Sequence, residues 1–307
     1  MIEMNKLFIV IVSFNGIKWI KNCLASCEGH NVIVVDNCSI DGTPDLIRNN
    51  FPNITLIEQS KNLGFGAANN IGFRRALDQG AKFLFLMNQD VYLKEGTITK
   101  LLHEFKKNEN YGILSPVHLS GSGDCLDENF AVYTSNKKNK KLVFDMYNNQ
   151  LRNVYDFDFI NAAAWLIPTS VIKLIGGFDP IFFHYQEDNN YCQRIRYFDL
   201  KIGLVINSFI LHDRAERSQR ELSVEDQVVN YCNLLRLRFG DINLDFNEKD
   251  RLIFEKKKVI IRFLKRVISF DFVGATICLK QYTKIPKVFK EIKVSRHINR
   301  TVGEHYI

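Results

Sequence analysis

Short, largely apolar runs dominate the first ninety positions of the chain, at residues 7–12, 32–35, 54–58 and 83–87. Runs of this length predict strands that are covered on both faces, as in a parallel sheet. Helical segments fit between them. Thr43 and Pro44 can open one helix, because Thr caps helices and Pro is tolerated at the first helical position. The alternation predicts an α/β fold: a doubly wound, mostly parallel sheet flanked by helices.

The pattern weakens between residues 120 and 153, where polar stretches at 120–124 and 136–141 indicate exposed loops around a short hairpin. The elements expected beyond it are ordered structure at 157–168, a short helix, a turn at 176–179, a helix from Glu187, a last strand at 202–206 and a polar segment that contains His212.

The positive charge of the chain is concentrated near its C-terminal end. Residues 217–307 hold 19 Lys and Arg against 11 Asp and Glu, a balance of +8, whereas residues 1–216 hold 22 against 23. Residues 251–268 predict an amphipathic helix. Its expected apolar side comprises Leu252, Ile253, Val259, Ile260, Phe263, Leu264 and Val267, and its expected basic side comprises Lys258, Arg262, Lys265 and Arg266.

Two interpretations of this helix carry equal weight. It can pack on the rest of the protein with a solvated basic face, or it can lie on an anionic membrane leaflet. Nucleic-acid binding is a lesser alternative, because no known binding motif accompanies the charge. We therefore expect one α/β domain at 1–216, with halves at 1–118 and 119–216, and a basic helical segment at 217–307.

The composition is that of a soluble globular protein, with 46% hydrophobic residues. No apolar run approaches the ~20 residues needed to cross a bilayer, and residues 7–12 are too short for a signal-peptide core. We therefore expect a cytosolic protein, with attachment to the inner face of the cytoplasmic membrane as an alternative. The seven cysteines form no Cys-x-x-Cys pair, which favours reduced thiols. The spacing of Cys23 and Cys27 favours core packing over metal binding.

Carboxylates follow two of the predicted strands. Asp36 directly follows the run 32–35 and Asp90 lies just beyond the run 83–87, where parallel strands end at the ligand-binding edge of a sheet. With the glycine-containing turn 62–70 between them, they predict a nucleotide site, one carboxylate serving base or ribose and the other a hard cation. The chain has neither a Gly-x-Gly-x-x-Gly after its first strand nor a Walker motif, which argues against dinucleotide binding and ATPase chemistry.

Aromatic residues run directly into two carboxylates at residues 182–188. Glu187 and Asp188 open a helix, where the helix dipole favours acidic residues for structural reasons alone. A carboxylate beside aromatic walls is equally well placed as a general base. His212 is, on residue type alone, more often structural than a metal ligand.

Together these stretches resemble a family 2 glycosyltransferase with the GT-A fold, most closely the bacterial rhamnosyltransferase-like branch, over roughly residues 5–240. The resemblance is carried by motifs in the family's order: 13–16, 34–42, 62–70, 86–90, 176–188 and His212. Each motif is weak alone, but their order is specific.

The resemblance implies a role for individual residues. Asp36 contacts the base of a nucleotide sugar, Asp90 binds Mg²⁺ or Mn²⁺, and Asp188 is the catalytic base. His212 completes the metal site. Further nucleotide-sugar contacts are implied for Ser13, Asn15, Asn62, Gly64, Asn69 and Asn88, and acceptor contacts for Trp165 and Glu187.

Two positions depart from the family pattern. Asn88 replaces the first acid of the family's Asp-x-Asp, which removes one charge from the metal site, and Asn190 stands where many relatives have Asp. The implied activity is inverting transfer of a sugar from dTDP-rhamnose or a UDP-sugar to a glycan hydroxyl, free or lipid-linked, in bacterial surface polysaccharide synthesis.

Two alternatives remain open. A catalytically silent nucleotide-sugar-binding subunit of a membrane assembly is compatible with Asn88 and Asn190. A nucleotidyltransferase shares a similar α/β sheet, but residues 13–16 lack the glycine-rich, basic loop that such enzymes carry after the first strand.

Overall fold

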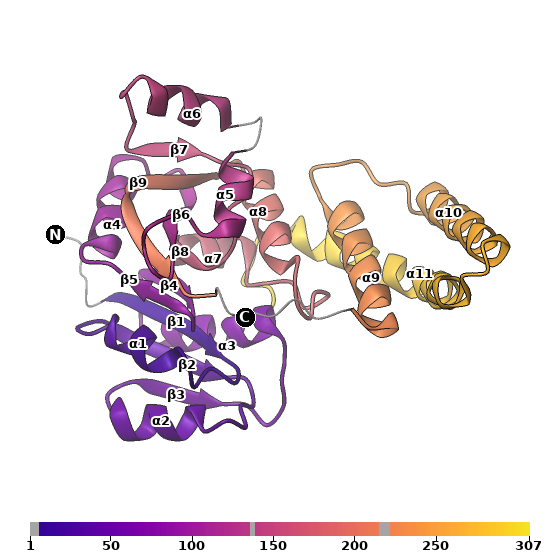
Figure 1. Ribbon diagram of the computed structural model, residues 1–307. Helices are drawn as coiled ribbons and strands as arrows, with labels where there is room; N and C mark the ends of the chain where they lie inside the picture. The colour runs from indigo at the N-terminus through magenta and orange to yellow at the C-terminus, as the bar shows by residue number, and fades with distance from the viewer. Residues whose placement is uncertain (1–5, 136–138, 215–221) are drawn as a thin grey trace.

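The computed structural model describes residues 6–135, 139–214 and 222–307. Within these ranges a mixed sheet of nine strands has the order β3-β2-β1-β4-β8-β6-β9-β5, with β7 pairing with β9 (Figure 1). The strands are β1 Leu7–Ser13, β2 Asn31–Asp36, β3 Thr55–Glu58, β4 Phe83–Asn88, β5 Val91–Leu93, β6 Tyr111–Ser120, β7 Val154–Asp156, β8 Ala164–Pro168 and β9 Lys201–His212. The first four strands are parallel, and β8 joins β4 antiparallel.

Helices cover both faces of the sheet. They are α1 Ile20–Ala25, α2 Thr43–Asn50, α3 Phe65–Asp78, α4 Thr97–Lys107, α5 Glu128–Thr134, α6 Lys140–Tyr147, α7 Thr169–Ile175 and α8 Glu187–Tyr197. One buried core combines residues of α3, α7 and α8 with Phe8 and Val10 of β1. The other combines α1, α2 and α4 with Ile9 and Ile11. Successive residues of β1 therefore enter opposite cores, which confirms the predicted doubly wound sheet.

The short hairpin expected between the polar stretches 120–124 and 136–141 is wrong, because most of the interval between them is the helix α5; an isolated antiparallel bridge joins Leu119 to Leu126 at its start. Asp127 caps α5 by accepting a hydrogen bond from the backbone N–H of Phe130, at 2.9 Å. Phe130 and Leu142 then bury their side chains in the core that contains α3. Part of the basic stretch expected as a loop, residues 136–138, lies outside the described residues.

The last strand is also longer than expected. β9 continues to His212, which therefore ends a strand instead of lying in a polar segment. His212 pairs with Val91 of β5 on one side and with Ser120 of β6 on the other. The extra length brings His212 beside the end of β4.

The C-terminal residues form three helices, α9 Val224–Gly240, α10 Glu248–Ile268 and α11 Phe272–Asn299, which share a core of their own. Ser295 and Asn299 of α11 donate hydrogen bonds to the carboxylate of Asp179, at 2.5 and 2.8 Å. The N–H of Gly177 donates to the carbonyl oxygen of His305, at 2.8 Å. The end of the chain is thus fixed to the turn before α8. Among the described helices, none is long and apolar enough to span a bilayer.

Candidate active site

A cleft of about 870 Å³ opens where β1, β2 and β4 end. Its floor includes Asn88 and Asp90, and its wall includes Gly64 at the start of α3 and the loop that leads into α8. Six residues expected in the site line it: Asn62, Gly64, Asn88, Asp90, Glu187 and Asp188. The other expected residues do not line it: Ser13, Asp36, Asn69 and His212 are buried, and Asn15 is exposed elsewhere on the surface.

Asp36 is buried and engaged with neighbouring residues. Its carboxylate accepts hydrogen bonds from the hydroxyls of Ser13, at 2.8 Å, and Ser39, at 2.6 Å, and from the N–H of Ser39, at 2.8 Å. Asn15 supports the same loop by accepting a bond from the N–H of Ile40, at 3.0 Å. These bonds fix the loop after β2, and the contact of Asp36 with a nucleotide base stays a prediction.

Asn37, which the sequence did not single out, organises the turn before α3. Its side chain donates to Asn62 Oδ1, at 2.9 Å, and accepts from the N–H of Leu63, at 2.8 Å. Gly64 follows with φ of 83°, and a Cβ there would collide with the carbonyl of Phe183. Glycine is therefore required for the close approach of this turn to the loop before α8. In the sequence, Asn37 is marked by its place beside Asp36, and nothing there indicates its contacts with the turn before α3.

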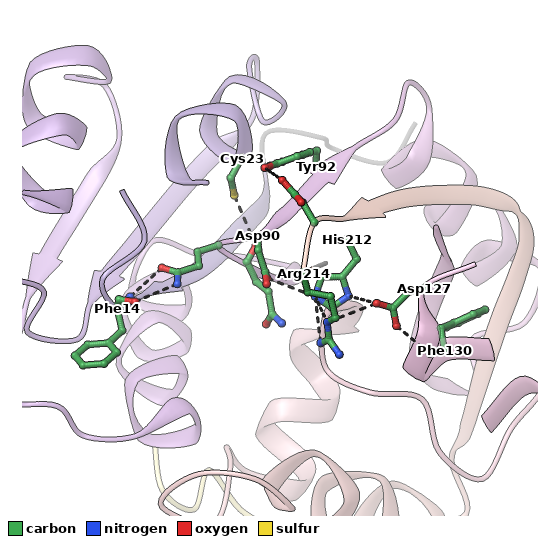
Figure 2. Close-up of polar contacts among 11 residues, drawn as sticks. Phe14, Cys23, Asp90, Tyr92, Asp127, Phe130, His212 and Arg214 are labelled. Atoms are coloured by element: carbon green, nitrogen blue, oxygen red, sulfur yellow. Dashed lines mark hydrogen bonds and ion pairs between the residues drawn. The ribbon is translucent and has the colours of Figure 1, made fainter. Parts of the chain in front are cut away.

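His212 lies between two carboxylates (Figure 2). Its Nε2 is 3.4 Å from Asp90 Oδ1, and its Nδ1 is 3.4 Å from Asp127 Oδ2. Arg214 lines the cleft, donates from Nε to His212 Nε2 at 3.3 Å, and lies 3.5 Å from Asp127. Sequence reasoning missed Asp127 and Arg214. Nothing in the sequence pairs Asp127 with His212, because the contact depends on the full length of β9.

The residues at this end of the cleft suit a divalent cation that prefers oxygen and imidazole ligands. No group of three or more His, Cys, Asp and Glu suited to a metal occurs in the described ranges. The carboxylate of Asp90 and the imidazole of His212 nevertheless form a pair at the cleft. Asn88 Oδ1 beside them is buried without a hydrogen-bond partner among the described residues. Mg²⁺ commonly takes only one or two protein ligands together with substrate phosphates. Metal binding stays a prediction.

Glu187 and Asp188 begin α8, directly after the left-handed residues Tyr185 and Gln186. Glu187 is 5% exposed, and burial, followed by the charge of Asp188, raises its pKa to about 8. Asp188 is more accessible, lines the cleft and accepts a bond from the N–H of Asn189, at 2.8 Å. Burial raises the pKa of Asp188 as well. Asp188 is therefore the carboxylate better placed to meet a substrate hydroxyl.

The prediction that Trp165 contacts an acceptor is wrong for this structure. Trp165 lies in β8, is 0% exposed and stacks on Phe178 within the core. Because β8 is covered on both faces, its side chains do not reach the cleft. Exposed aromatic side chains at the cleft are instead those of Phe14, Phe183 and Tyr185.

Three of the known proteins that this chain resembles are relatives of low identity. A low-salt glycan biosynthesis hexosyltransferase, Agl10, of Haloferax volcanii is 26% identical over 65% of this chain and 64% of its own length, slightly under two thirds. An N-acetylglucosaminyl-diphospho-decaprenol L-rhamnosyltransferase of Mycobacterium tuberculosis is 25% identical over 64% of this chain and 71% of its own. The dTDP-rhamnosyl transferase RfbF of Shigella flexneri is 22% identical over 94% and 93%.

Solved structures share the fold. S. aureus TarS 1–349 in complex with UDP has a TM-score of 0.54 at 16% identity, over 86% of this chain and 72% of its own. The mannosyltransferase PcManGT from Pyrobaculum calidifontis, in complex with GDP-Man and Mn²⁺, has a TM-score of 0.56 at 12% identity, over 94% and 73%. The fold is thus GT-A-like. The family model described as glycosyl transferase family 2 matches residues 8–162, just over half of the chain. The chain belongs to glycosyl transferase family 2.

Proposed function

We propose that the protein transfers a sugar from a nucleoside-diphosphate sugar, dTDP-rhamnose or a UDP-sugar, to a hydroxyl of a glycan acceptor in surface polysaccharide synthesis. One observation carries the proposal: the Asp90 carboxylate and the Glu187–Asp188 pair line the same cleft. The names of the rhamnosyltransferase relatives support the donor class, and the decaprenol-linked substrate named for one of them supports a lipid-linked acceptor.

In the proposed reaction Asp188 takes the proton of the acceptor hydroxyl as that oxygen bonds to the anomeric carbon. The bond between the anomeric carbon and the diphosphate oxygen breaks on the opposite side, so the configuration inverts in one step. Asp90 and His212 would hold a divalent cation, which would offset the charge of the leaving diphosphate. Arg214, in the cleft wall, contributes a further positive charge there.

A thermal-unfolding screen tests donor binding directly. The ligands are dTDP, UDP, GDP and their sugars, each with and without Mn²⁺. A specific ligand at 100 times its dissociation constant should add roughly 2.7 kcal/mol to the free energy of unfolding. We expect Mn²⁺-dependent stabilisation by one base over the others. Absence of a shift with every nucleotide would contradict the proposed donor site.

Asp127 should hold His212 in the orientation that binds the metal. Its Oδ1 caps α5, whereas its Oδ2 faces His212 Nδ1. Asp127→Asn can keep the cap, but an amide N–H₂ at the second position cannot accept from Nδ1. We expect Mn²⁺ in the presence of the nucleoside diphosphate to bind about 10–100-fold more weakly, measured by electron paramagnetic resonance of free Mn²⁺.

The matched control is Asp124→Asn, which removes a carboxylate bonded to Ser120 and Ser122 in the same loop. It should leave Mn²⁺ binding unchanged. Thermal unfolding confirms that both variants are folded. Equal Mn²⁺ affinity in Asp127→Asn and the unaltered protein would show that Asp127 does not position His212.

A further inference from the structure

The outward side of α10 and its junction with α11 expose a set of large apolar side chains. We call this set the α10 outer face; its members are Ile253, Phe254, Ile260, Ile261, Leu264, Val267, Ile268, Phe270, Phe272 and Val273. Phe270, in the turn between the two helices, and Phe272, the first residue of α11, are 79% and 67% exposed. Figure 1 shows this turn at the end of the helical segment that lies away from the sheet.

The packing of α10 does not need this face. Val259 is buried, Leu252 and Phe263 are half-buried, and all three contribute to the core shared with α9 and α11. The apolar side predicted from the sequence therefore divides in two, because Ile253, Ile260, Leu264 and Val267 point outward. Arg262, expected on the basic side, instead donates to Gln281 of α11, at 3.0 Å.

Lysines interrupt and border the α10 outer face. At 100° per residue, Lys257 falls within the apolar sector, and Lys258 and Lys265 fall at its edge. All three are exposed, and none forms an ion pair within the described part of the chain. Among the acidic residues nearby, Glu255 is buried near Arg238, Asp271 pairs with Arg266, and Asp250 accepts a hydrogen bond from Asn247 at the start of α10. The face is thus both apolar and positively charged.

We propose that the α10 outer face binds in the plane of an anionic lipid surface. Its apolar side chains would enter the boundary between headgroups and acyl chains, and its lysines would meet anionic headgroups. A second copy of the chain is a poorer occupant, because a two-fold contact through this face would bring like charges together. Lipid binding does not depend on the proposed sugar transfer, although it would bring the protein close to a lipid-linked acceptor.

Co-sedimentation of the full chain with vesicles tests the proposal. We expect binding to vesicles of about 30% phosphatidylglycerol in phosphatidylcholine at low salt, and a large loss in 0.5 M salt or with phosphatidylcholine alone. Failure to bind the anionic vesicles at low salt would overturn it.

Two sets of variants separate this face from general charge attraction. Lys257→Gln, Lys258→Gln and Lys265→Gln together should weaken vesicle binding about 10–100-fold. The matched triple Lys21→Gln, Lys94→Gln and Lys106→Gln removes the same charge from exposed positions on the catalytic domain and should change binding less than about threefold. Equal losses in the two triples would overturn the proposal.

The exposed phenylalanines at the junction of α10 and α11 provide an independent test. Phe270→Ser with Phe272→Ser should weaken vesicle binding at least about tenfold, because both side chains are exposed and their loss leaves the helical core intact. Thermal shifts caused by nucleotides, measured on the same variants, show whether the donor site is intact independently of vesicle binding. A concentration-dependent dimer in sedimentation velocity that this double variant abolishes, with vesicle binding unchanged, would assign the face to a second copy instead.

Discussion

Asp188→Asn should lower the rate of sugar transfer by about 10²–10⁴-fold, the usual contribution of a positioned general base. The amide retains the shape of the carboxylate and can still accept the bond from the N–H of Asn189. It cannot take a proton from an acceptor hydroxyl. Donor affinity, measured calorimetrically, should change little, because Asp188 acts on the acceptor. Product formation under single-turnover conditions is the measurement.

Asp188→Glu serves as the matched variant, because it keeps the charge and should recover part of the rate. Unaltered turnover in Asp188→Asn would remove Asp188 from the role of base. Loss of transfer in Glu187→Gln with normal turnover in Asp188→Asn would assign the base to Glu187. Donor binding by the unaltered protein without transfer to any glycan would favour the alternative of a silent nucleotide-sugar-binding subunit.

The parts of the fold that the sequence predicts are those whose signal is local. The strands β1, β2 and β4 are short apolar runs, and their burial on both faces follows from that pattern alone. Asp90 could be placed at the cleft because it lies two residues beyond the end of β4. Asp188 could be placed at a helix start because an acidic pair follows the aromatic run 182–185.

Contacts between distant segments could not be predicted in this way. His212 meets Asp127 only because β9 runs six residues beyond its expected end at Ile206. The resemblance placed Trp165 at the acceptor site, and a strand covered on both faces has no alternation that could have identified this residue as part of the core. In α10 the pattern gave one apolar side, whereas the contacts with α9 and α11 decide which of those residues are buried.

Glu187→Gln should make the protein more stable than the unaltered chain at pH 8 to 9 and equally stable near pH 4.5. The pKa of Glu187 is raised from the ordinary 4.5 to about 8, so between these values the native state retains a proton that the unfolded chain has released. The free energy of unfolding therefore falls as pH rises through this window, by about 1.4 kcal/mol per pH unit. Gln carries no charge at any pH, so the variant does not lose free energy of unfolding in this way.

The full difference, over 3.5 pH units, has an upper bound of about 5 kcal/mol. Urea unfolding of both proteins at intervals from pH 4.5 to 9 measures it. The effect should shrink in the Asp188→Asn background, because the charge of Asp188 is the second cause of the raised pKa. Glu95→Gln, at an exposed position, is the control and should show no such pH-dependent gain. A gain in Glu187→Gln that is constant across pH would mean that packing, and not ionisation of a buried carboxyl beside Asp188, sets the stability at this position.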